Sequence, residues 1–202
     1  MTIDPRDVQP AEAYRMLTSA VTPRPIGWVS TVSPRGVANL APYSFFNAVG
    51  ANPPAVMFSP TNRRDGSPKD SLLNARSTRQ FVVNIVSDAL AERMNATSRE
   101  LPYEVSEFEA VGLTPVPSVR VRPPRVAEAA VHIECEVMHI VPVGEGPLAG
   151  NIVIGRVLLL HVADDLLGPD GLIDPGKLDA VGRMGGSWYS RTRDRFELHR
   201  PT

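Results

Sequence analysis

The sequence predicts a mainly β protein with helical decoration, in which antiparallel strands form a closed barrel. The chain of 202 residues contains 20 prolines and 15 glycines. Proline breaks the interior of a helix, so this content disfavours a helix bundle. Short apolar stretches outnumber candidate helices and are mostly separated by turn sequences, which is typical of antiparallel sheets. With 43% hydrophobic and 21% charged residues, the composition is that of a folded globular protein. We expect one domain spanning residues 1–202.

The first half of the chain predicts one helix and three strands. Residues 10–20 consist mostly of good helix formers. Residues 25–32 (PIGWVSTV) are rich in β-branched and aromatic side chains and predict a strand. Residues 33–36 (SPRG) fit a type I turn, so residues 37–42 form the return strand of a hairpin. The apolar run at residues 55–59 predicts a third, central strand.

The second half adds further strands and short helices. Ser67 suits an N-cap, Pro68 the first helical position and Asp70 the acidic partner of a capping box, which predicts a helix over residues 67–76. The remaining elements are expected as a strand at 80–86, helices at 87–95 and 106–111, and long strands at 125–141 and 151–163 joined by the loop 142–150.

Charge and cysteine content exclude several classes of protein. Lys and Arg total 21 against 22 Asp and Glu, giving a net charge of −1, so no general basic field exists for nucleic acid. The single cysteine excludes a disulfide framework. The polar N-terminus lacks a signal core, and no apolar run is long enough to span a bilayer. We expect a cytoplasmic protein that binds neither nucleic acid nor membrane. The G-x-G-x-x-G dinucleotide motif is absent.

One alternating strand carries titratable side chains. In VHIECEVMHIV, His132, Glu134 and Glu136 fall on one face. They could hold a metal, but no second ligand cluster is evident, so we expect a solvated or subunit-facing row and no metal site. Cys135, on the opposite face, is expected to be an inert core thiol. His161 lies in the most apolar strand and is expected to be buried and hydrogen-bonded, the alternative being an active-site contact.

Three polar features do not resemble plain core. In residues 22–25 (TPRP), two prolines stiffen the chain and aim Arg24. Residues 39–47 (NLAPYSFFN) gather amides, hydroxyls and aromatic rings where a strand ends, and Pro42 is expected to interrupt the ladder and free backbone N–H groups. Residues 59–74 combine cations and hydroxyls with a capped helix N-terminus. Each has a purely structural alternative: the entry of an edge strand for the first, an aromatic-lined corner of the core for the second and a solvated basic loop for the third. Together they suit the ring and phosphate of a mononucleotide such as FMN.

The same residues resemble a known family. TPRPIGWVST, NLAPYSFFN, the KDS-x-x-N segment and the late R-M-G-G-x-x-Y are similar to the flavin reductase-like, FMN-binding split-barrel proteins, near the flavoredoxin branch. The resemblance runs from about Ala20 to Tyr189. It implies a six-stranded Greek-key barrel and a homodimer with one FMN per subunit at the interface. The family commonly has Thr where Ser71 stands, and the hydroxyl is retained.

The resemblance also implies which residues bind the cofactor. The first strand lines the flavin and the next segment follows the isoalloxazine, with a phosphate cradle beyond. The closing residues come from the same or the other subunit. These groups are, in order, Trp28, Val29, Ser30 and Thr31; Asn39, Ala41, Tyr43, Ser44 and Phe45; Ser59, Lys69, Asp70, Ser71 and Asn74; Arg24, which lies near the pocket; and Arg183, Gly185, Gly186 and Tyr189.

The implied activity is hydride transfer from NAD(P)H to FMN, with electrons passing on to free flavin, a metal complex, a redox protein or a partner monooxygenase. No catalytic side chain is required, because the flavin carries the chemistry. Trp28, Tyr43 or Tyr189 could flank the nicotinamide, and Arg183 or Arg64 could meet its phosphates. Two alternatives stay open: an FMN-binding electron carrier or binding protein without its own NAD(P)H site, and a barrel that holds no flavin.

Overall fold

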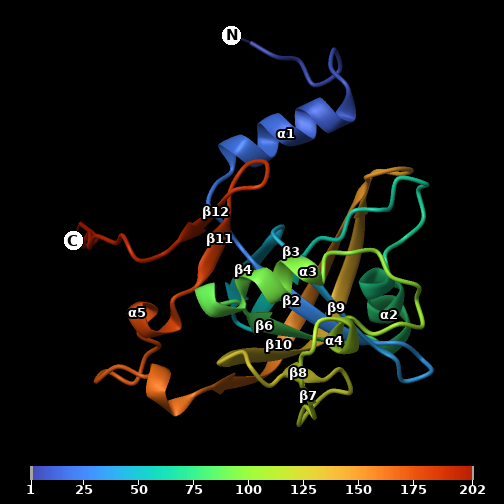
Figure 1. The fold of residues 1–202 in the computed structure, drawn as a ribbon. Coiled ribbons are helices and arrows are strands. Elements are labelled where there is room, and N and C mark those ends of the chain that lie inside the picture. Colours follow the sequence, from blue (N-terminus) through green and yellow to red (C-terminus); the bar gives the residue numbers. More distant parts are fainter. Residues whose placement is uncertain (1, 202) are drawn as a thin grey trace.

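The computed structural model describes residues 2–201 (Figure 1). The helices are α1 (Pro10–Ala20), α2 (Asp70–Thr78), α3 (Ala91–Ala96), α4 (Glu107–Ala110) and α5 (Pro175–Leu178), with short 3-10 helices η1 (Asp88–Leu90) and η2 (Asp164–Leu166). The strands are β1 (Arg24–Pro25), β2 (Gly27–Val32), β3 (Ala38–Tyr43), β4 (Phe46–Ala51), β5 (Pro54–Phe58), β6 (Gln80–Ile85), β7 (Pro115–Val116), β8 (Arg125–Val126), β9 (Val131–Val143), β10 (Gly150–Val162), β11 (Val181–Arg183) and β12 (Tyr189–Arg191). Over residues 2–201, no helix combines the length and apolar character needed to cross a membrane.

Seven antiparallel strands form the barrel in the order β3-β2-β6-β9-β10-β5-β4. The end strands β3 and β4 each pair with one neighbour only, so the barrel is split between them. The mainly β class and the antiparallel split barrel implied by the resemblance are therefore confirmed, with seven strands rather than six. The closed barrel that the strand pattern favoured is corrected to an open one. The sequence pattern missed β4 because only Phe46 of that strand is buried and no alternation of apolar residues marks it.

The strand β2 is buried on both of its faces. Val29 points into the barrel, where it packs in a core with Phe58 and Phe81. Trp28 points outward into a second core with Met94 and Phe108, which α3 and α4 cover. Because the side chains of a strand alternate between its faces, β2 forms the wall between the two cores. It thereby fixes the position of its hairpin partner β3.

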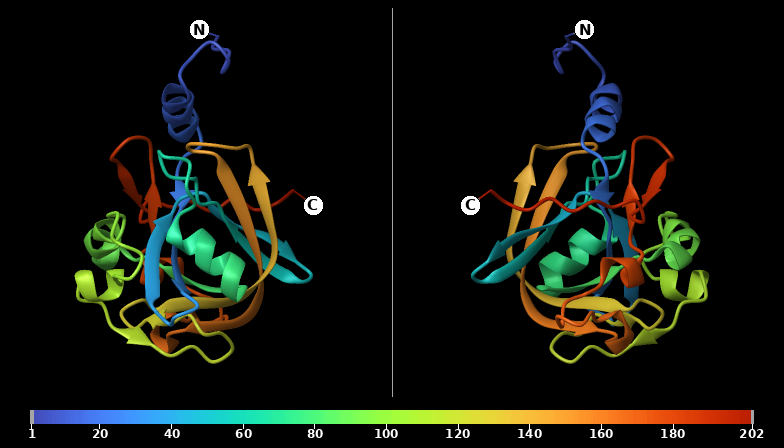
Figure 2. Two further views of the ribbon diagram at one scale, coloured as in Figure 1. Left: turned by 90° about the vertical axis from the view of Figure 1, so that its right-hand side faces the viewer. Right: turned by 90° about the vertical axis from the view of Figure 1, so that its left-hand side faces the viewer.

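The helix α2 lies between the β2–β3 hairpin and the long β9–β10 hairpin (Figure 2). Its buried Leu72 and Ala75 belong to the barrel core. The helix begins at Asp70 rather than at residue 67, and its N-cap Lys69 makes no capping bond with its side chain. The predicted capping box is wrong because the Ser67 amide and hydroxyl both donate to Asp65 Oδ1, at 2.8 and 2.6 Å, in the preceding turn.

Pro42 does not interrupt the ladder, which corrects a second expectation. Trp28 pairs with Pro42, and the β2–β3 ladder continues to Tyr43. The strand β3 is an edge strand, and the N–H of Leu40, two residues earlier, points away from β2 to a side chain of α4. By the two-residue period, Pro42 places its missing donor on that same unpaired edge, where proline is tolerated.

The other expected elements differ mainly at their ends. The strand expected at 125–141 is divided into β8 and β9, whereas α1 and the long strand β10 lie close to their expected positions. The glycine-rich tail, which the sequence left unassigned, forms the hairpin β11–β12 and pairs with β1 in a small sheet. In Figure 1, α1 projects from the barrel next to this hairpin.

Candidate functional site

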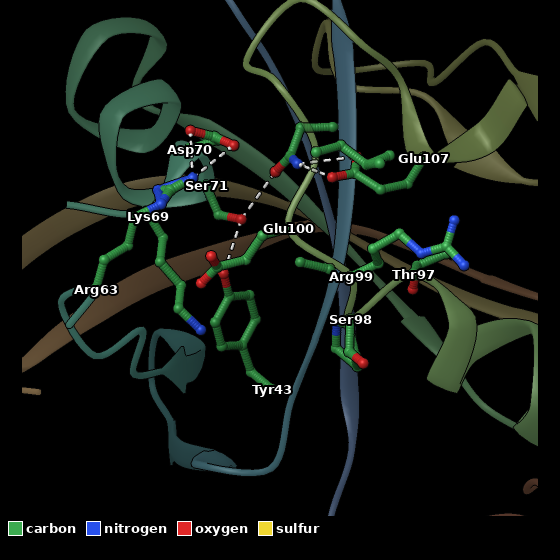
Figure 3. A pocket seen from close by; sticks show the side chains of 14 residues that line it. Tyr43, Arg63, Lys69, Asp70, Ser71, Thr97, Ser98, Arg99, Glu100 and Glu107 are labelled. Atoms are coloured by element: carbon green, nitrogen blue, oxygen red, sulfur yellow. Dashed lines mark hydrogen bonds and ion pairs between the residues drawn. The ribbon is translucent and has the colours of Figure 1, made fainter. Parts of the chain in front are cut away.

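Two adjoining cavities follow the edge strand β3 and share Pro42 and Ser98 as lining residues. The smaller, of about 80 Å³, lies between β3, the start of α2 and residues 97–101 (Figure 3). The larger, of about 270 Å³, lies between α1, the end of α3 and the hairpin β11–β12. The split edge of the barrel therefore carries two neighbouring chambers, which together are called the groove.

A chain of hydrogen bonds forms the floor of the smaller chamber. The Tyr43 hydroxyl donates to Ser71 Oγ at 2.9 Å (Figure 3), and the Ser71 hydroxyl donates to Asn39 Oδ1 at 2.8 Å. The Asn39 amide nitrogen donates to both carboxylate oxygens of Glu107 at 2.9 Å. Burial raises the pKa of Tyr43 and the pKa of Glu107. The four side chains come from β3, α2 and α4, so the tertiary fold brings them together.

A second branch meets the same amide. Thr31 Oγ1 donates to Asn39 Oδ1 at 3.3 Å and accepts from Asn74 Nδ2 at 3.0 Å. The Tyr103 hydroxyl donates to Asn74 Oδ1 at 2.6 Å. Thr31 and Asn74, both predicted site residues, therefore lie behind the chamber floor. Thr31 bonds to Asn39 directly, and Asn74 acts on Asn39 through Thr31.

Charges of both signs line the smaller chamber, with Arg63, Lys69 and Arg99 alongside Asp70, Glu100 and Glu107. Lys69 lines this chamber with its ammonium 5.9 Å from the centre of the Tyr43 ring, and burial lowers the pKa of Lys69. Arg63 forms an ion pair with Asp70 at 3.0 Å. The first N–H groups of a helix have no acceptor within the helix, and those of α2 adjoin this cation. This end of the groove can therefore hold an anion.

The larger chamber has a positively charged wall. Arg15, Arg24 and Arg183 line it, and none of the described residues around it is acidic. The guanidinium of Arg183 lies 4.5 Å from the centre of the Tyr189 ring, which faces the same chamber. Arginine next to an aromatic ring suits a ligand that carries both a planar ring and negative charge.

Arg24 is buried and connects the two walls of the larger chamber. Its guanidinium donates to the carbonyl oxygens of Thr18 at 2.5 Å and Val21 at 2.7 Å, at the end of α1. It also donates to the Met184 carbonyl at 3.1 Å and to Ser44 Oγ at 3.3 Å. Burial lowers the pKa of Arg24. The residue thus ties α1 to the β11–β12 hairpin.

Some of the predicted residues lie outside the two chambers. Trp28 is fully buried and donates from Nε1 to Thr97 Oγ1 at 2.9 Å, so it has no exposed face for a nicotinamide. Val29 lies in the barrel core, and Ser30 donates to the Pro124 carbonyl. Ser59 is half-buried next to the start of β10.

The remaining predicted residues adjoin the larger chamber or the rim of the smaller one. Phe45 packs edge to face on Tyr14 of α1, with ring centres 6.1 Å apart. Gly185 lies so close to α1 that an added Cβ would be 2.6 Å from Ser19 Oγ. Gly186 lines the larger chamber, and Ala41 lines the smaller.

The sequence reasoning missed several lining residues, above all Glu107 and the segment 97–101. The sequence predicts Tyr14 and Arg15 only as part of the helix at residues 10–20, although both line the larger chamber. A glutamate in the first turn of a short helix is ordinarily a charge that favours the helix dipole, so no local signal marked Glu107. Its role depends on the contact between α4 and β3, which are far apart in the chain.

The row on β9 is not solvated as expected. Glu134 is fully buried and accepts from the backbone N–H groups of Val119 and Arg120 at 2.9 and 2.6 Å and contacts His161 at 2.6 Å. His132 is buried as well and contacts the Val126 carbonyl at 2.8 Å, so the expectation fails for both. The segment at Val119 and Arg120 covers Glu134, and β8 lies against His132. His161 is hydrogen-bonded as predicted, although only partly buried.

Cys135 is buried in the barrel core, as predicted. Burial raises the pKa of its thiol, which makes it a poor nucleophile. Across residues 2–201, the structure contains no group of three or more His, Cys, Asp or Glu side chains arranged to hold a metal ion.

Fold and groove together define a split-barrel protein with a polar cleft along its open edge. Residues 19–182 match the family model described as flavin reductase like domain, and the chain belongs to this family. This confirms the family predicted from the sequence motifs.

Three solved structures are similar over almost their whole length. Component B of nitrilotriacetate monooxygenase from Bacillus cereus is 36% identical with a TM-score of 0.93, covering 98% of both chains. The 2-nitrobenzoate 2-nitroreductase NbaA of Pseudomonas fluorescens is 31% identical with a TM-score of 0.89, covering 100% of this chain and 97% of that one. A protein with a split barrel domain from Shewanella frigidimarina shares the fold, with 23% identity, a TM-score of 0.85 and full coverage of both chains.

Proposed function

We propose that the protein is an FMN-dependent oxidoreductase that takes hydride from NAD(P)H and passes electrons to a second acceptor. The observation that supports this best is the two-chambered groove, which has a cation and a helix N-terminus at one end and an arginine-lined aromatic chamber at the other. One chamber suits the phosphorylated ribityl chain of FMN. The other suits a second planar, anionic ligand such as a pyridine nucleotide.

The residues present fit FMN. A phosphate needs charge-assisted donors, which Lys69 and the first N–H groups of α2 supply, while Arg63 is partly neutralised by Asp70. The ribityl chain carries hydroxyls, and the smaller chamber has a floor of polar side chains. When bound, FMN supplies the hydride-accepting ring chemistry that no side chain of the protein provides.

The chain's own residues then bind and orient the two ligands and exclude water from the site. Ser44 lines the larger chamber and accepts a hydrogen bond from Arg24, and we assign its backbone to the edge of the flavin ring. Tyr189 and Arg183 form a stacked pair in the larger chamber, which can position a nicotinamide and its phosphates. Holding two reactants in contact is the main contribution that such a site makes to the rate.

We further propose a homodimer in which α1 packs on a second copy of the chain. The helix projects from the barrel (Figure 1), and Tyr14, Met16, Leu17 and Val21 expose between 48% and 57% of their surface. Apolar side chains at this density on one helix favour a partner surface. Because the similar Bacillus cereus protein is a monooxygenase component, reduced flavin passed to a cytoplasmic partner monooxygenase is one fitting acceptor route.

The test is to mix purified protein with FMN and then with NADH or NADPH while following flavin absorbance near 450 nm. We expect FMN to bind and to be bleached by one of the nucleotides faster than in buffer. Binding without faster bleaching would leave an FMN carrier and remove the reductase proposal, and failure to bind FMN would remove both. Light scattering on the same samples tests the homodimer.

A further inference from the structure

The buried carboxylate of Glu107 determines which hydrogen-bonding groups the smaller chamber offers to a ligand. Its side chain is 5% exposed and makes no ion pair among the described residues. It accepts from Asn39 Nδ2 and, at 2.8 Å, from the N–H of Leu40. Burial raises the pKa of Glu107, whereas the hydrogen bonds from Leu40 and Asn39 act in the opposite direction and favour the ionised form. In that form the carboxylate only accepts hydrogen bonds. The Asn39 amide is therefore held with its nitrogen toward Glu107 and its oxygen away from it.

This orientation propagates through both branches of the network. Because Asn39 Oδ1 can only accept, the Ser71 hydroxyl must donate to it, and Ser71 can then only accept from Tyr43. In the second branch, Thr31 must donate to Asn39 and accept from Asn74. Every proton in the network points toward Glu107.

The hydroxyls on the floor of the chamber consequently offer acceptors rather than donors. Tyr43 and Ser71 are buried residues that line the chamber, and with their protons engaged inward their hydroxyl oxygens have only lone pairs left for a ligand. Such lone pairs repel a phosphate oxygen but can accept a hydrogen bond from an alcohol group. The family resemblance assigns Ser71 to the phosphate. The direction of the hydrogen bonds in this network instead favours a contact between Ser71 and a hydroxyl group of the ligand.

We propose that Glu107 is a positioning residue that orients the Tyr43–Ser71–Asn39 chain so that the smaller chamber binds the ribityl hydroxyls of the flavin, leaving the phosphate to Lys69 and the N-terminus of α2. This inference rests on the proposed flavin function and assigns its polyol subsite. Glu107 does not touch the flavin in this assignment and acts through Asn39.

The test substitutions change the donor–acceptor direction of the hydrogen bonds while keeping the side chains nearly the same shape. Glu107→Gln places an N–H group against an Asn39 N–H group and so releases the amide from its single orientation. The double variant Asn39→Asp with Glu107→Gln exchanges the two functional groups, restores an acceptor toward Ser71 and keeps the net charge. Glu109→Gln changes an exposed glutamate on the same helix and is the matched control.

For each variant, dissociation constants are measured for FMN, riboflavin and lumiflavin by flavin fluorescence. We expect Glu107→Gln to weaken FMN and riboflavin by the same factor, about tenfold for one misoriented hydrogen bond. Lumiflavin, which lacks the ribityl chain, should be unaffected, and the double variant should restore binding to within about twofold of wild type. Lys69→Ala should weaken FMN only.

Other outcomes would overturn the assignment. A loss confined to FMN would place the network at the phosphate. An equal loss for lumiflavin, or a double variant no better than the single one, would mean a merely structural role. If Glu107→Gln does not fold, Tyr43→Phe must show the same equal loss for FMN and riboflavin.

A thermal-unfolding cycle of the flavin-free variants at positions 39 and 107 separates this inference from the proposed function. If the substitutions at positions 39 and 107 are coupled in stability but the wild type binds no flavin, the flavin function is refuted and the hydrogen-bond network stands. Absence of coupling would refute the network itself.

Discussion

Replacing Arg24 tests whether one buried cation holds the larger chamber together. Arg24→Met retains most of the side-chain volume but removes four hydrogen bonds, to Thr18, Val21, Met184 and Ser44. Three of the acceptors are backbone carbonyls, which become unsatisfied when a buried donor is lost. We expect both a less stable protein and a looser chamber.

The magnitude follows from the contacts. Hydrogen bonds to a charged group contribute about 1.5–3 kcal/mol each, so four give about 6–12 kcal/mol before the cost of burying the ion. That cost is several kcal/mol for a guanidinium without a carboxylate partner. A net loss of about 3 kcal/mol remains, which lowers the melting temperature of a domain of this size by about 6–12 °C.

The assay pairs differential scanning calorimetry with steady-state kinetics. Because α1 and the β11–β12 hairpin both wall the larger chamber, we expect KM for the reducing nucleotide to rise more than kcat falls. Arg24→Lys, which has fewer donors in a different geometry, should be intermediate. Arg15→Met removes an exposed arginine of the same chamber and should leave the melting temperature within about 2 °C. Equal stability of Arg24→Met and Arg15→Met would refute the reasoning.

Three further predictions concern the barrel. Gly155→Ala should destabilise the protein by about 1–3 kcal/mol in chemical denaturation, since an added Cβ would lie 2.4 Å from the ring of Phe81. Cys135 should react with a thiol reagent only as fast as the protein unfolds, because burial raises the pKa of its thiol. Glu134→Gln should speed tryptic cleavage in residues 118–122 and reduce the loss of stability on acidification. Although burial alone would raise the pKa of Glu134, backbone N–H groups and His161 hold it below its ordinary value, so its contribution is present above the unfolded pKa and lost as the pH falls through the folded one.

Each of the three has a control or a contrary outcome. Gly50→Ala introduces the same methyl at an exposed strand position where the nearest atom, the Pro53 carbonyl oxygen, would be 3.6 Å away, and it should be close to neutral. Rapid labelling of Cys135 in the native state would contradict its burial. Glu136→Gln, an exposed position on the same strand, should alter neither the cleavage nor the acid profile.

Local pattern by itself determined the mainly β class, the hairpin β2–β3, the helix α1 and the long strands, because alternation, turn residues and helix formers act over a few neighbours. It also determined the family, since TPRPIGWVST and NLAPYSFFN lie in contiguous segments. It failed at β4, whose exposed side chains give no period, and at the start of α2, where Asp65 competes for Ser67.

Only the tertiary structure decided how the groove is built. The unpaired edges of β3 and β4 split the barrel, which no local pattern encodes because strand pairing depends on distant partners. Arg24 and Lys69 were found from the sequence, but their roles follow from walls contributed by α1, α2 and β11. Glu107 became a site residue only when α4 packed on β3. A side chain's type is written in the sequence, whereas the direction of its hydrogen bonds depends on what folding places opposite it.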